Sequence, residues 1–359
     1  MRHLVCVAAM LIALTTTANA AQGHVPAAFP SLESAVRSVK EADFCGEPVP
    51  MHIAEVRERF EKELLLMLWD RAQVILWLKR SARYFPHIEK LLKARNMPDH
   101  LKYVAVIESA LRPEAGSWAG AKGLWQFMPA TGRKYGLTVD RRVDDRRNFY
   151  FATRAALDYL QKLYDQFGSW AMAAAAYNMG ENGLERAVEK QETDDFYRLH
   201  LPTETERYVL RAIAARMIME DPARFGFDLR PEDYYTPIMF DRVRVKARRA
   251  VPLMVIAKSA NTYYKTIKDL NPQLLSDEVP VGEHPVFLPV GATEGFLKRY
   301  SAVLAEYRKE HGPRTYRVQS GDSLTRISRR YGVSIRRLKR LNGLGAKGII
   351  HPGQVLRLE

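Results

Sequence analysis

Apolar side chains recur at helical spacing through the first two thirds of the chain. Between residues 52 and 95, Val56, Phe60 and similar residues return at helical intervals, and Glu, Lys and Arg fill the opposite face. This pattern predicts two or three helices with breaks near Pro86 and Pro98. We expect these helices to follow a mixed, proline-containing lead-in and to pack against the segments that come after them.

The next helix is predicted to begin with Asp99 as its N-cap and to end at Pro113, because the residue before a proline avoids the helical region. A loop rich in Gly, Ser and Ala follows it. Strand signals are nearly absent from residue 52 to residue 225, so we expect this region to be entirely helical. Further helices are predicted at residues 130–135, 149–167, 170–177 and 207–219.

From residue 234 the pattern changes to short β-branched runs between helical stretches. A weak internal repeat lies there, since Leu253 and Asn271 match Leu324 and Asn342 at a constant offset of 71 residues. Each copy predicts strand, helix, helix and strand, so we infer two small βααβ units. A charged helical connector that ends in a Gly-Pro hinge is expected between them.

These patterns predict a mainly α protein, in which an all-helical domain precedes the two βααβ modules. The length of 359 residues and the apolar fraction of 47% suit two or three domains with a real core. The expected divisions are a signal peptide at 1–20, a helical segment at 21–95, the main helical domain at 96–225, a first module at 235–291, a helical linker at 292–313 and a second module at 314–359.

The first residues of the chain predict export. A basic start precedes a short apolar run at 4–14, and Ala18-Asn19-Ala20 forms the small-residue cleavage site of a secretory signal peptide. A buried N-terminal helix is the alternative. Export argues against nucleic acid as the partner of a chain with net charge +14 and favours an anionic cell-wall polymer. We therefore expect a location in the periplasm or cell envelope of a bacterium.

Cysteine and histidine usage predicts no metal and no other cofactor. Cys6 lies in the predicted signal run, and Cys45 is interpreted as a small buried apolar residue rather than a reactive thiol. The nine histidines are scattered without the spacing of zinc ligands. No further apolar run approaches the length of a membrane span.

Glu108 is the first candidate for catalysis. It lies at the edge of an apolar stripe and near the C-terminal end of its predicted helix, where unsatisfied carbonyls disfavour a negative charge. Partial burial and this dipole both favour a raised pKa. A surface residue or a paired structural charge is the alternative, and Ser109 beside it is interpreted as structural. Aromatic and apolar residues surround Gln126 in the following loop, a composition that suits the stacking of sugar rings.

Three motifs resemble those of a known family: Glu-Ser at 108–109, PEAGSWAGAKGLWQFMPATG at 113–132 and AYNMG at 176–180. They resemble the signature of lytic transglycosylases with a goose-type-lysozyme-like catalytic domain, and the fuller pattern is similar to the membrane-bound lytic murein transglycosylase D subgroup. The segment 315–359 resembles a LysM module, which binds glycans that contain N-acetylglucosamine. The copy at 241–290 resembles a degenerate LysM module that lacks the SGDSL-type turn, so its glycan binding is left open.

The resemblance implies non-hydrolytic cleavage of the β-1,4 bond between N-acetylmuramic acid and N-acetylglucosamine in peptidoglycan. The C6 hydroxyl of the muramoyl sugar would attack C1 and leave a 1,6-anhydro end. An ordinary glycosidase needs two carboxylates. Here one suffices, because Glu108 can protonate the leaving oxygen and then accept the proton of the C6 hydroxyl. The implied partners are peptidoglycan glycan strands, and we expect a monomer with peripheral wall or membrane association and no nucleic acid.

The motif positions also imply substrate contacts. Ser117 and Gln126 would hydrogen-bond acetamido or peptide-bearing groups, and Phe127 and Met128 would line the sugar site. Because aromatic residues dominate cores, Trp125 and Phe127 could equally belong to the core.

Tyr177 would lie over the catalytic carboxylate, with Asn178 fixing its turn, although Tyr177 could also serve packing alone. The run Asp144-Asp145-Arg146-Arg147 offers a second acid or a metal site as one interpretation, and helix capping with local ion pairs as the other. Two rival functions stay open: a lysozyme- or chitinase-type hydrolase and a non-catalytic cell-wall-binding protein.

Overall fold

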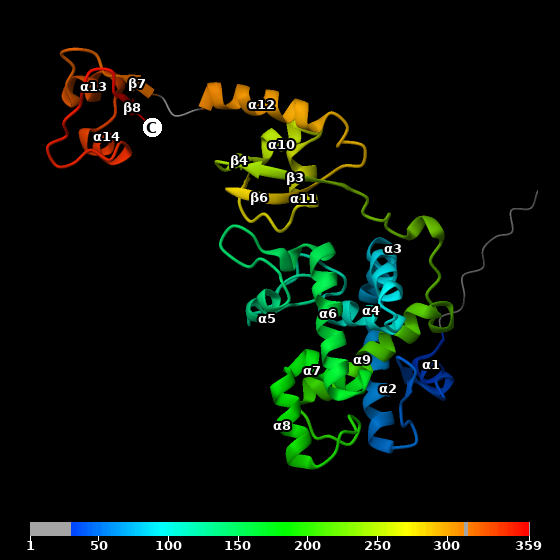
Figure 1. Ribbon diagram of the computed structural model, residues 1–359. Helices are drawn as coiled ribbons and strands as arrows, with labels where there is room; N and C mark the ends of the chain where they lie inside the picture. The colour runs from blue at the N-terminus through cyan, green and yellow to red at the C-terminus, as the bar shows by residue number, and fades with distance from the viewer. Residues whose placement is uncertain (1–29, 312–314, 359) are drawn as a thin grey trace, which may run out of the picture. The chain divides into compact units, whose positions relative to one another are not determined.

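The computed structural model describes residues 30–311 and 315–358 and is mainly α-helical (Figure 1). The predicted signal peptide and the glycine and proline of the predicted hinge lie outside the described residues. Two compact units are distinguished. The first contains the described residues up to 82, with 98–107 and 163–235, and the second contains 83–97, 108–162 and the described residues from 236 onward.

The first unit is helical apart from one short hairpin, and it shares the helices α3 (Arg71–Ala94), α4 (Lys102–Ser109) and α6 (Phe149–Phe167) with the second unit. Its other elements are α1 (Leu32–Ser38), β1 (Asp43–Phe44), β2 (Glu47–Pro48), α2 (Ala54–Trp69), the 3-10 turn η1 (Asp99–Leu101), α7 (Trp170–Met179), α8 (Glu181–Gln191), α9 (Thr203–Glu220), η3 (Ala223–Phe225) and η4 (Pro231–Asp233).

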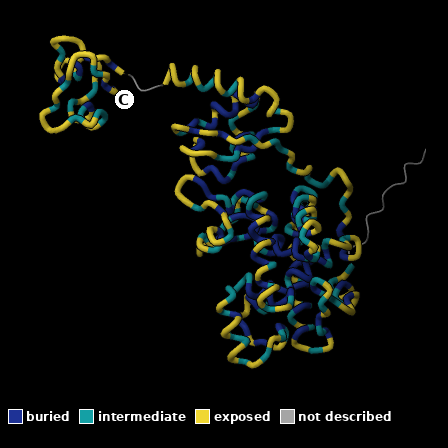
Figure 2. The backbone as a smooth tube through the Cα atoms, in the orientation of Figure 1, coloured by how far each residue is buried: buried dark blue, intermediate teal, exposed yellow. Residues whose placement is uncertain are grey.

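Helix α9 is the centre of the first unit, and it packs against both α2 and α7. Its side chains are buried along most of its length (Figure 2). Glu63 of α2, itself buried, accepts hydrogen bonds from Arg207 of α9 at 2.5 and 3.1 Å. This pairing satisfies a carboxylate that would otherwise be costly to bury.

The second unit contains the last part of α3, the end of α4 with the loop segments after it, α5 (Pro129–Lys134), the 3-10 turn η2 (Asp145–Arg147) and most of α6. Helix α6 has the bounds predicted from the apolar periodicity, because Asn148 caps its first turn through Oδ1 and Gly168 follows its last residue in the left-handed region. The bounds of α5 differ from the predicted ones by one residue at each end.

Both βααβ predictions are confirmed. The first module contains β3 (Asp241–Ala247), β4 (Val251–Pro252), α10 (Leu253–Ser259), α11 (Tyr264–Leu270), β5 (Glu278–Val279) and β6 (Gly282–Leu288), with β3 and β6 antiparallel. The second module contains β7 (Thr315–Arg317), α13 (Leu324–Tyr331), α14 (Ile335–Leu341) and β8 (Val355–Arg357), with β7 and β8 antiparallel. Helix α12 (Phe296–His311) lays an apolar stripe on the core of the first module.

Asn271 and Asn342, which occupy the same position in the two copies of the internal repeat, make the same contacts in both modules. Asn271 donates to the carbonyl of Phe287 and accepts from its N–H, both at 2.8 Å. Asn342 makes the same two bonds with Arg357, at 2.9 and 2.6 Å. In both modules one amide side chain therefore fastens the end of the second helix to the last strand, a contact that requires a donor and an acceptor on one short side chain.

Several predicted helix limits are wrong: α9 begins at Thr203 rather than at residue 207, and α7 ends at Met179 rather than at residue 177. The N-cap before η1 is Pro98, and Asp99 instead pairs through its carboxylate with Lys102. Helix α4 ends at Ser109 rather than at Pro113, because Ala110 and Leu111 have left-handed backbone conformations, with φ angles of 54° and 57°.

The predicted break at Pro86 is also absent, since α3 continues through it. The lost N–H bond of this proline is offset by the buried side chains of Tyr84, Phe85 and Ile88 around it. The break falls instead at Asp70, between α2 and α3.

Candidate active site

Glu108 is the penultimate residue of α4 and is half-buried. It lies between Ile107 and Ser109, which are both buried. The left-handed residues that follow end the helix at once, so the carboxylate lies at the helix C-terminus, as predicted. Ser109 has the structural role predicted for it: its hydroxyl donates to the carbonyl of Leu124 at 2.8 Å and ties the helix end to the motif loop.

The motif loop, defined as residues 115–128, is held by backbone hydrogen bonds. Lys122 and Phe127 exchange two N–H to carbonyl bonds of 3.1 Å, and Gly123 donates to the carbonyl of Ala115 at 2.9 Å. Ser117 turns its hydroxyl toward its own turn and accepts from the N–H of Ala121 at 3.0 Å. The loop is therefore a fixed structure, although it has almost no regular secondary structure.

Three predicted substrate residues in this loop differ in exposure. Gln126 has a left-handed φ of 47° and is half-buried, and its side-chain amide donates to the carbonyl of Gly123 at 2.7 Å. Phe127 is only 2% exposed, whereas Met128 is 42% exposed. Trp125 belongs to the core, as one of its two interpretations predicted, and its indole N–H donates to Thr153 at 3.0 Å.

Arg146 connects the motif loop to the segment before α6. It is 5% exposed and forms a bidentate ion pair with Asp144, with both nitrogen to oxygen distances at 2.8 Å. Its remaining guanidinium nitrogen donates to the carbonyls of Gly120 and Phe127, again at 2.8 Å. One buried side chain thus fixes three loop segments.

The backbone of Arg146 also explains a motif glycine. A Cβ on Gly123 would lie 1.7 Å from the carbonyl oxygen of Arg146, so only glycine permits this approach. Asp144 is committed to capping η2 and to its ion pair, which confirms the interpretation of local pairing. Burial raises the pKa of Asp145, whose carboxylate accepts a hydrogen bond from the N–H of Thr138 at 2.9 Å.

Tyr177 and Asn178 belong to the first unit, near the end of α7. Both are half-buried, and Asn178 accepts a hydrogen bond from the hydroxyl of Thr205 at 2.8 Å. At the other end of α7 Ser169 is the N-cap, and the carboxylate of Glu47 accepts from the N–H of Trp170 at 2.6 Å, a favourable charge for a helix N-terminus.

Trp118 was not among the residues predicted from the sequence to contact substrate. Its side chain is 108% exposed at the tip of the motif loop, in a turn closed by a 3.1 Å bond from the N–H of Gly120 to the carbonyl of Ser117. The signal for it was the occurrence of one tryptophan among Gly, Ser and Ala, where no core is available to bury it.

The described residues contain neither a candidate metal site nor a candidate membrane span. In residues 30–311 and 315–358 no group of His, Cys, Asp and Glu side chains could hold a metal ion. None of the helices in that part of the chain is long and apolar enough to cross a membrane. Burial raises the pKa of the Cys45 thiol well above its usual range, in line with an unreactive cysteine.

Comparison with known proteins assigns the class. Residues 85–199 match the model of the Transglycosylase SLT domain, and residues 316–359 match that of the LysM domain. The chain is 43% identical over 88 residues to the "Peptidoglycan transglycosylase gp16" of Escherichia phage T7, covering 24% of this chain and 7% of that protein. Its last module is similar to part of the "Probable peptidoglycan endopeptidase LytE" of Bacillus subtilis, at 53% identity over 45 residues, 12% of this chain and 13% of that protein. The class is that of the lytic transglycosylases, enzymes that cleave peptidoglycan.

A longer match defines the family. The "Membrane-bound lytic murein transglycosylase D" of Escherichia coli K12 is 31% identical over 330 residues, which cover 88% of this chain and 72% of that protein. The chain therefore belongs to the family of the membrane-bound lytic murein transglycosylase D.

Proposed function

We propose that Glu108 is the single general acid and base in the cleavage of the bond between N-acetylmuramic acid and N-acetylglucosamine. In its protonated form it gives a proton to the glycosidic oxygen as the bond to C1 breaks. As a carboxylate it then accepts the proton of the C6 hydroxyl, whose oxygen bonds to C1 and closes the 1,6-anhydro ring. The substrate supplies the nucleophile, so a second carboxylate is not required.

The observation that carries this proposal is the half-buried position of Glu108 at the C-terminal end of α4. Both partial desolvation and the negative end of a helix disfavour the charged form, and the first step needs the neutral acid. Asp144, one of the carboxylates considered as a second acid, is committed to its ion pair with Arg146, which supports a reaction with a single acid.

The substrate contacts of the motif loop follow the exposure of its side chains. Met128 and Trp118 offer apolar surface to sugar rings, and Ser117 and Gln126 offer polar groups to the acetamido or peptide-bearing substituents. Buried Phe127 supports the loop through its packing and backbone bonds. Sugar stacking on exposed aromatic side chains suits a polymer that is bound by several weak contacts.

The roles of Tyr177 and Asn178 rest on the third motif. Asn178 is tied to Thr205, which fits the task of holding the end of α7 in one conformation. For Tyr177 the motif implies contact with the substrate.

The location and partners complete the proposal. The pattern of residues 1–20 supports export to the periplasm of a bacterium, and the LysM domain supports binding to glycan strands of the wall. We expect a monomer that associates peripherally with the wall or membrane, and no nucleic-acid partner.

Substitution of Glu108 by Gln tests the proposal. The amide keeps the size and polarity of the side chain but cannot donate and accept the proton, so we expect cleavage of purified peptidoglycan to fall at least ~10³-fold while binding to it persists. The products of the unchanged chain, analysed by mass spectrometry, should end in 1,6-anhydro-N-acetylmuramic acid.

Each rival function has its own outcome. Products with reducing ends would identify a hydrolase, and wall cleavage by the Glu108→Gln chain at the unchanged rate would contradict the assigned role of this carboxylate. Absence of any cleavage by the unchanged chain would leave a non-catalytic wall-binding protein.

A further inference from the structure

A cavity of about 530 Å³ lies within the second unit, between the helical part and the first βααβ module. One side is formed by Arg83 and Tyr84 of α3, by the turn at Pro113 and Glu114, and by the start of α6. The other side is formed by the strand entry before β3, by the end of α11 and by β6. Its volume is in the range of pockets that hold small organic ligands.

The two sides of this cavity are fastened together. Gln273 of the module is 2% exposed, and it accepts a hydrogen bond from Asn148 through its side-chain oxygen and another from the N–H of Asp144 through its carbonyl, both at 2.9 Å. The N–H of Leu275 donates to the carbonyl of Arg142 at 2.9 Å, and Val143 enters the apolar core of the module. The cavity is therefore preformed, and a ligand would not have to order its walls.

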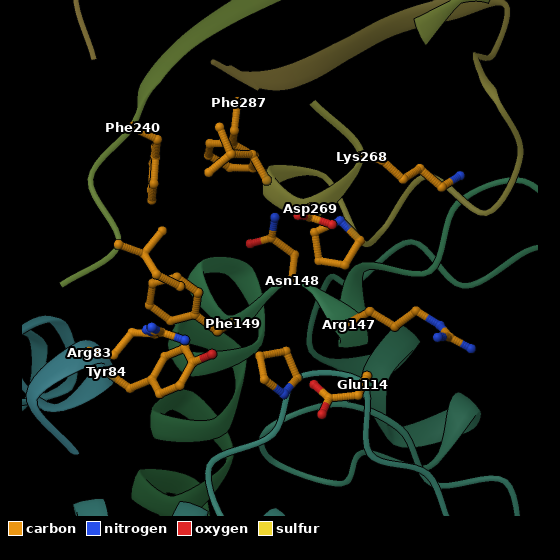
Figure 3. A pocket seen from close by; sticks show the side chains of 14 residues that line it. Arg83, Tyr84, Glu114, Arg147, Asn148, Phe149, Phe240, Lys268, Asp269 and Phe287 are labelled. Atoms are coloured by element: carbon orange, nitrogen blue, oxygen red, sulfur yellow. The ribbon is translucent and has the colours of Figure 1, made fainter. Parts of the chain in front are cut away.

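The lining combines an aromatic surface with several charges. In Figure 3 the rings of Tyr84, Phe149, Phe240 and Phe287, which come from both walls, gather toward the left of the view. Arg147 and Lys268 lie toward the right. Phe240 meets Phe287 edge to face, with ring centroids 4.6 Å apart, so this surface is held by its own packing.

Three cations and two carboxylates line the cavity: Arg83, Arg147, Lys268, Glu114 and Asp269. A neutral sugar chain offers no groups to match three cations. In a matching ligand, several carboxylates would pair with the cations and one ammonium would pair with the carboxylates of the lining. Short apolar side chains would contact the aromatic rings.

The position of the cavity along the chain points to the same ligand. Glu114 follows Glu108 by six residues, so their Cα atoms are at most about 20 Å apart. An extended peptide of four or five residues spans roughly 13–18 Å. The segment between them is not extended, because Glu108 and Ser109 are helical and Ala110 and Leu111 have left-handed φ angles, so the true separation is shorter than this limit. A peptide attached to a sugar at Glu108 can therefore extend to this cavity.

We propose that the cavity binds the peptide arm of peptidoglycan, with its carboxylates at Arg83, Arg147 and Lys268, and that the first βααβ module forms the outer wall of this site. This inference rests on the proposed function, because it takes the wall polymer as the substrate. It assigns the module at residues 241–290 a role in substrate selection in place of independent glycan binding.

The test compares two substrates of the full chain: soluble glycan strands that carry peptides, and the same strands after an amidase has removed the peptides. In the unchanged chain, kcat/KM should be higher for the peptide-bearing strands. Lys268→Glu reverses one charge of the cavity and should lower the ratio of the two kcat/KM values about fivefold, mainly through KM. Lys258→Glu, an exposed lysine of α10 outside the cavity, is the matched control and should leave the ratio unchanged.

A second variant separates binding from folding. Lys268 donates to the carbonyls of Leu274 and Ser276, at 3.1 and 2.7 Å, so Lys268→Gln retains a donor while it removes the charge. It should lower the ratio in the same direction, and calorimetric titration with the free tetrapeptide released from peptidoglycan should detect weaker binding than in the unchanged chain.

Three results would overturn the inference: an equal preference of the unchanged chain for both substrates, an unchanged ratio in both Lys268 variants, or no binding of the tetrapeptide. Failure of the proposed function is distinguishable, because it would appear as the absence of 1,6-anhydro products from either substrate. The tetrapeptide titration would still report on the cavity in that case.

Discussion

Arg146 makes the position of the motif loop depend on a single buried side chain. The substitution Arg146→Met would leave the buried Asp144 carboxylate with only the more distant Arg147 as a charged partner, at 3.7 Å. It would also remove the side-chain donor of the Gly120 carbonyl, while the Phe127 carbonyl would keep only the N–H of Lys122. We expect the free energy of unfolding to fall by about 3–5 kcal/mol and cleavage to fall with it. Urea unfolding and the rate of product release measure the two effects.

The double variant Arg146→Met/Asp144→Leu serves as the control for charge burial. It removes both charges, so much of the stability should return, while cleavage should stay low because the loop carbonyls still lack the bonds from the Arg146 guanidinium. Recovery of full activity in the double variant would contradict a positioning role for Arg146.

The side chain of Trp118 is fully exposed, so its large apolar ring does not contribute to the packing of the fold. If it provides a stacking surface, Trp118→Ala should raise KM for glycan strands about three- to tenfold, with little change in the free energy of unfolding, because the ring has no buried contacts to lose. Trp118→Tyr should retain most of the affinity. Steady-state kinetics on soluble strands checks both, and an unaltered KM in Trp118→Ala would exclude this contact.

At the scale of elements, the junction between α3 and α6 predicts a pH dependence. His87 of α3 stacks on Tyr150 of α6, with ring centroids 4.6 Å apart, and its Nε2 has no hydrogen-bond partner in the described residues. Burial, with smaller contributions from Lys90 and Arg154, lowers the pKa of His87 to about 4. The folded chain therefore holds this ring neutral, while the unfolded chain takes up a proton near pH 6.5.

The sign of the effect follows from this difference. Between pH 6.5 and pH 4 the unfolded state binds more protons than the folded state, so stability falls as the pH is lowered, by up to about 3 kcal/mol from this group. His87→Phe keeps a stacking ring and removes the titration, so its unfolding free energy should change less over the same range. Urea unfolding at pH 7 and at pH 4.5 checks the prediction, and parallel curves for the two chains would contradict it.

Local sequence rules located most helices and failed where tertiary contacts override them. The periodicity of α6 gave both of its ends, since a cap and a glycine lie beside its apolar stripe. The break predicted at Pro86 is absent, because the buried residues around it hold α3 together. Helix α4 ends before Pro113 because Ser109 binds the carbonyl of Leu124, a contact between segments 15 residues apart.

At the scale of the whole chain, the second module has its own apolar core, built from residues between Tyr316 and Leu358. From Arg314 onward its segment carries 11 Lys and Arg residues against two carboxylates, so we expect it to attract an anionic wall. A chain that stops at His311 should cleave short soluble strands at the same rate but bind intact sacculi less tightly, and the remaining binding should depend less on salt. A pull-down with sacculi at low and high salt measures this, and equal binding of both chains would contradict the prediction.

The sequence by itself determined the class of the enzyme, the mainly helical fold, the two βααβ modules and the position of Glu108 at a helix end. These features depend on local periodicity and on motifs of neighbouring residues, which a single chain displays directly. The tertiary structure alone decided that Phe127 is buried while Trp118 is exposed, and that Arg146 holds the motif loop. It also decided that the first module closes a charged cavity through Gln273, because that contact joins residues 125 positions apart and no local pattern encodes it.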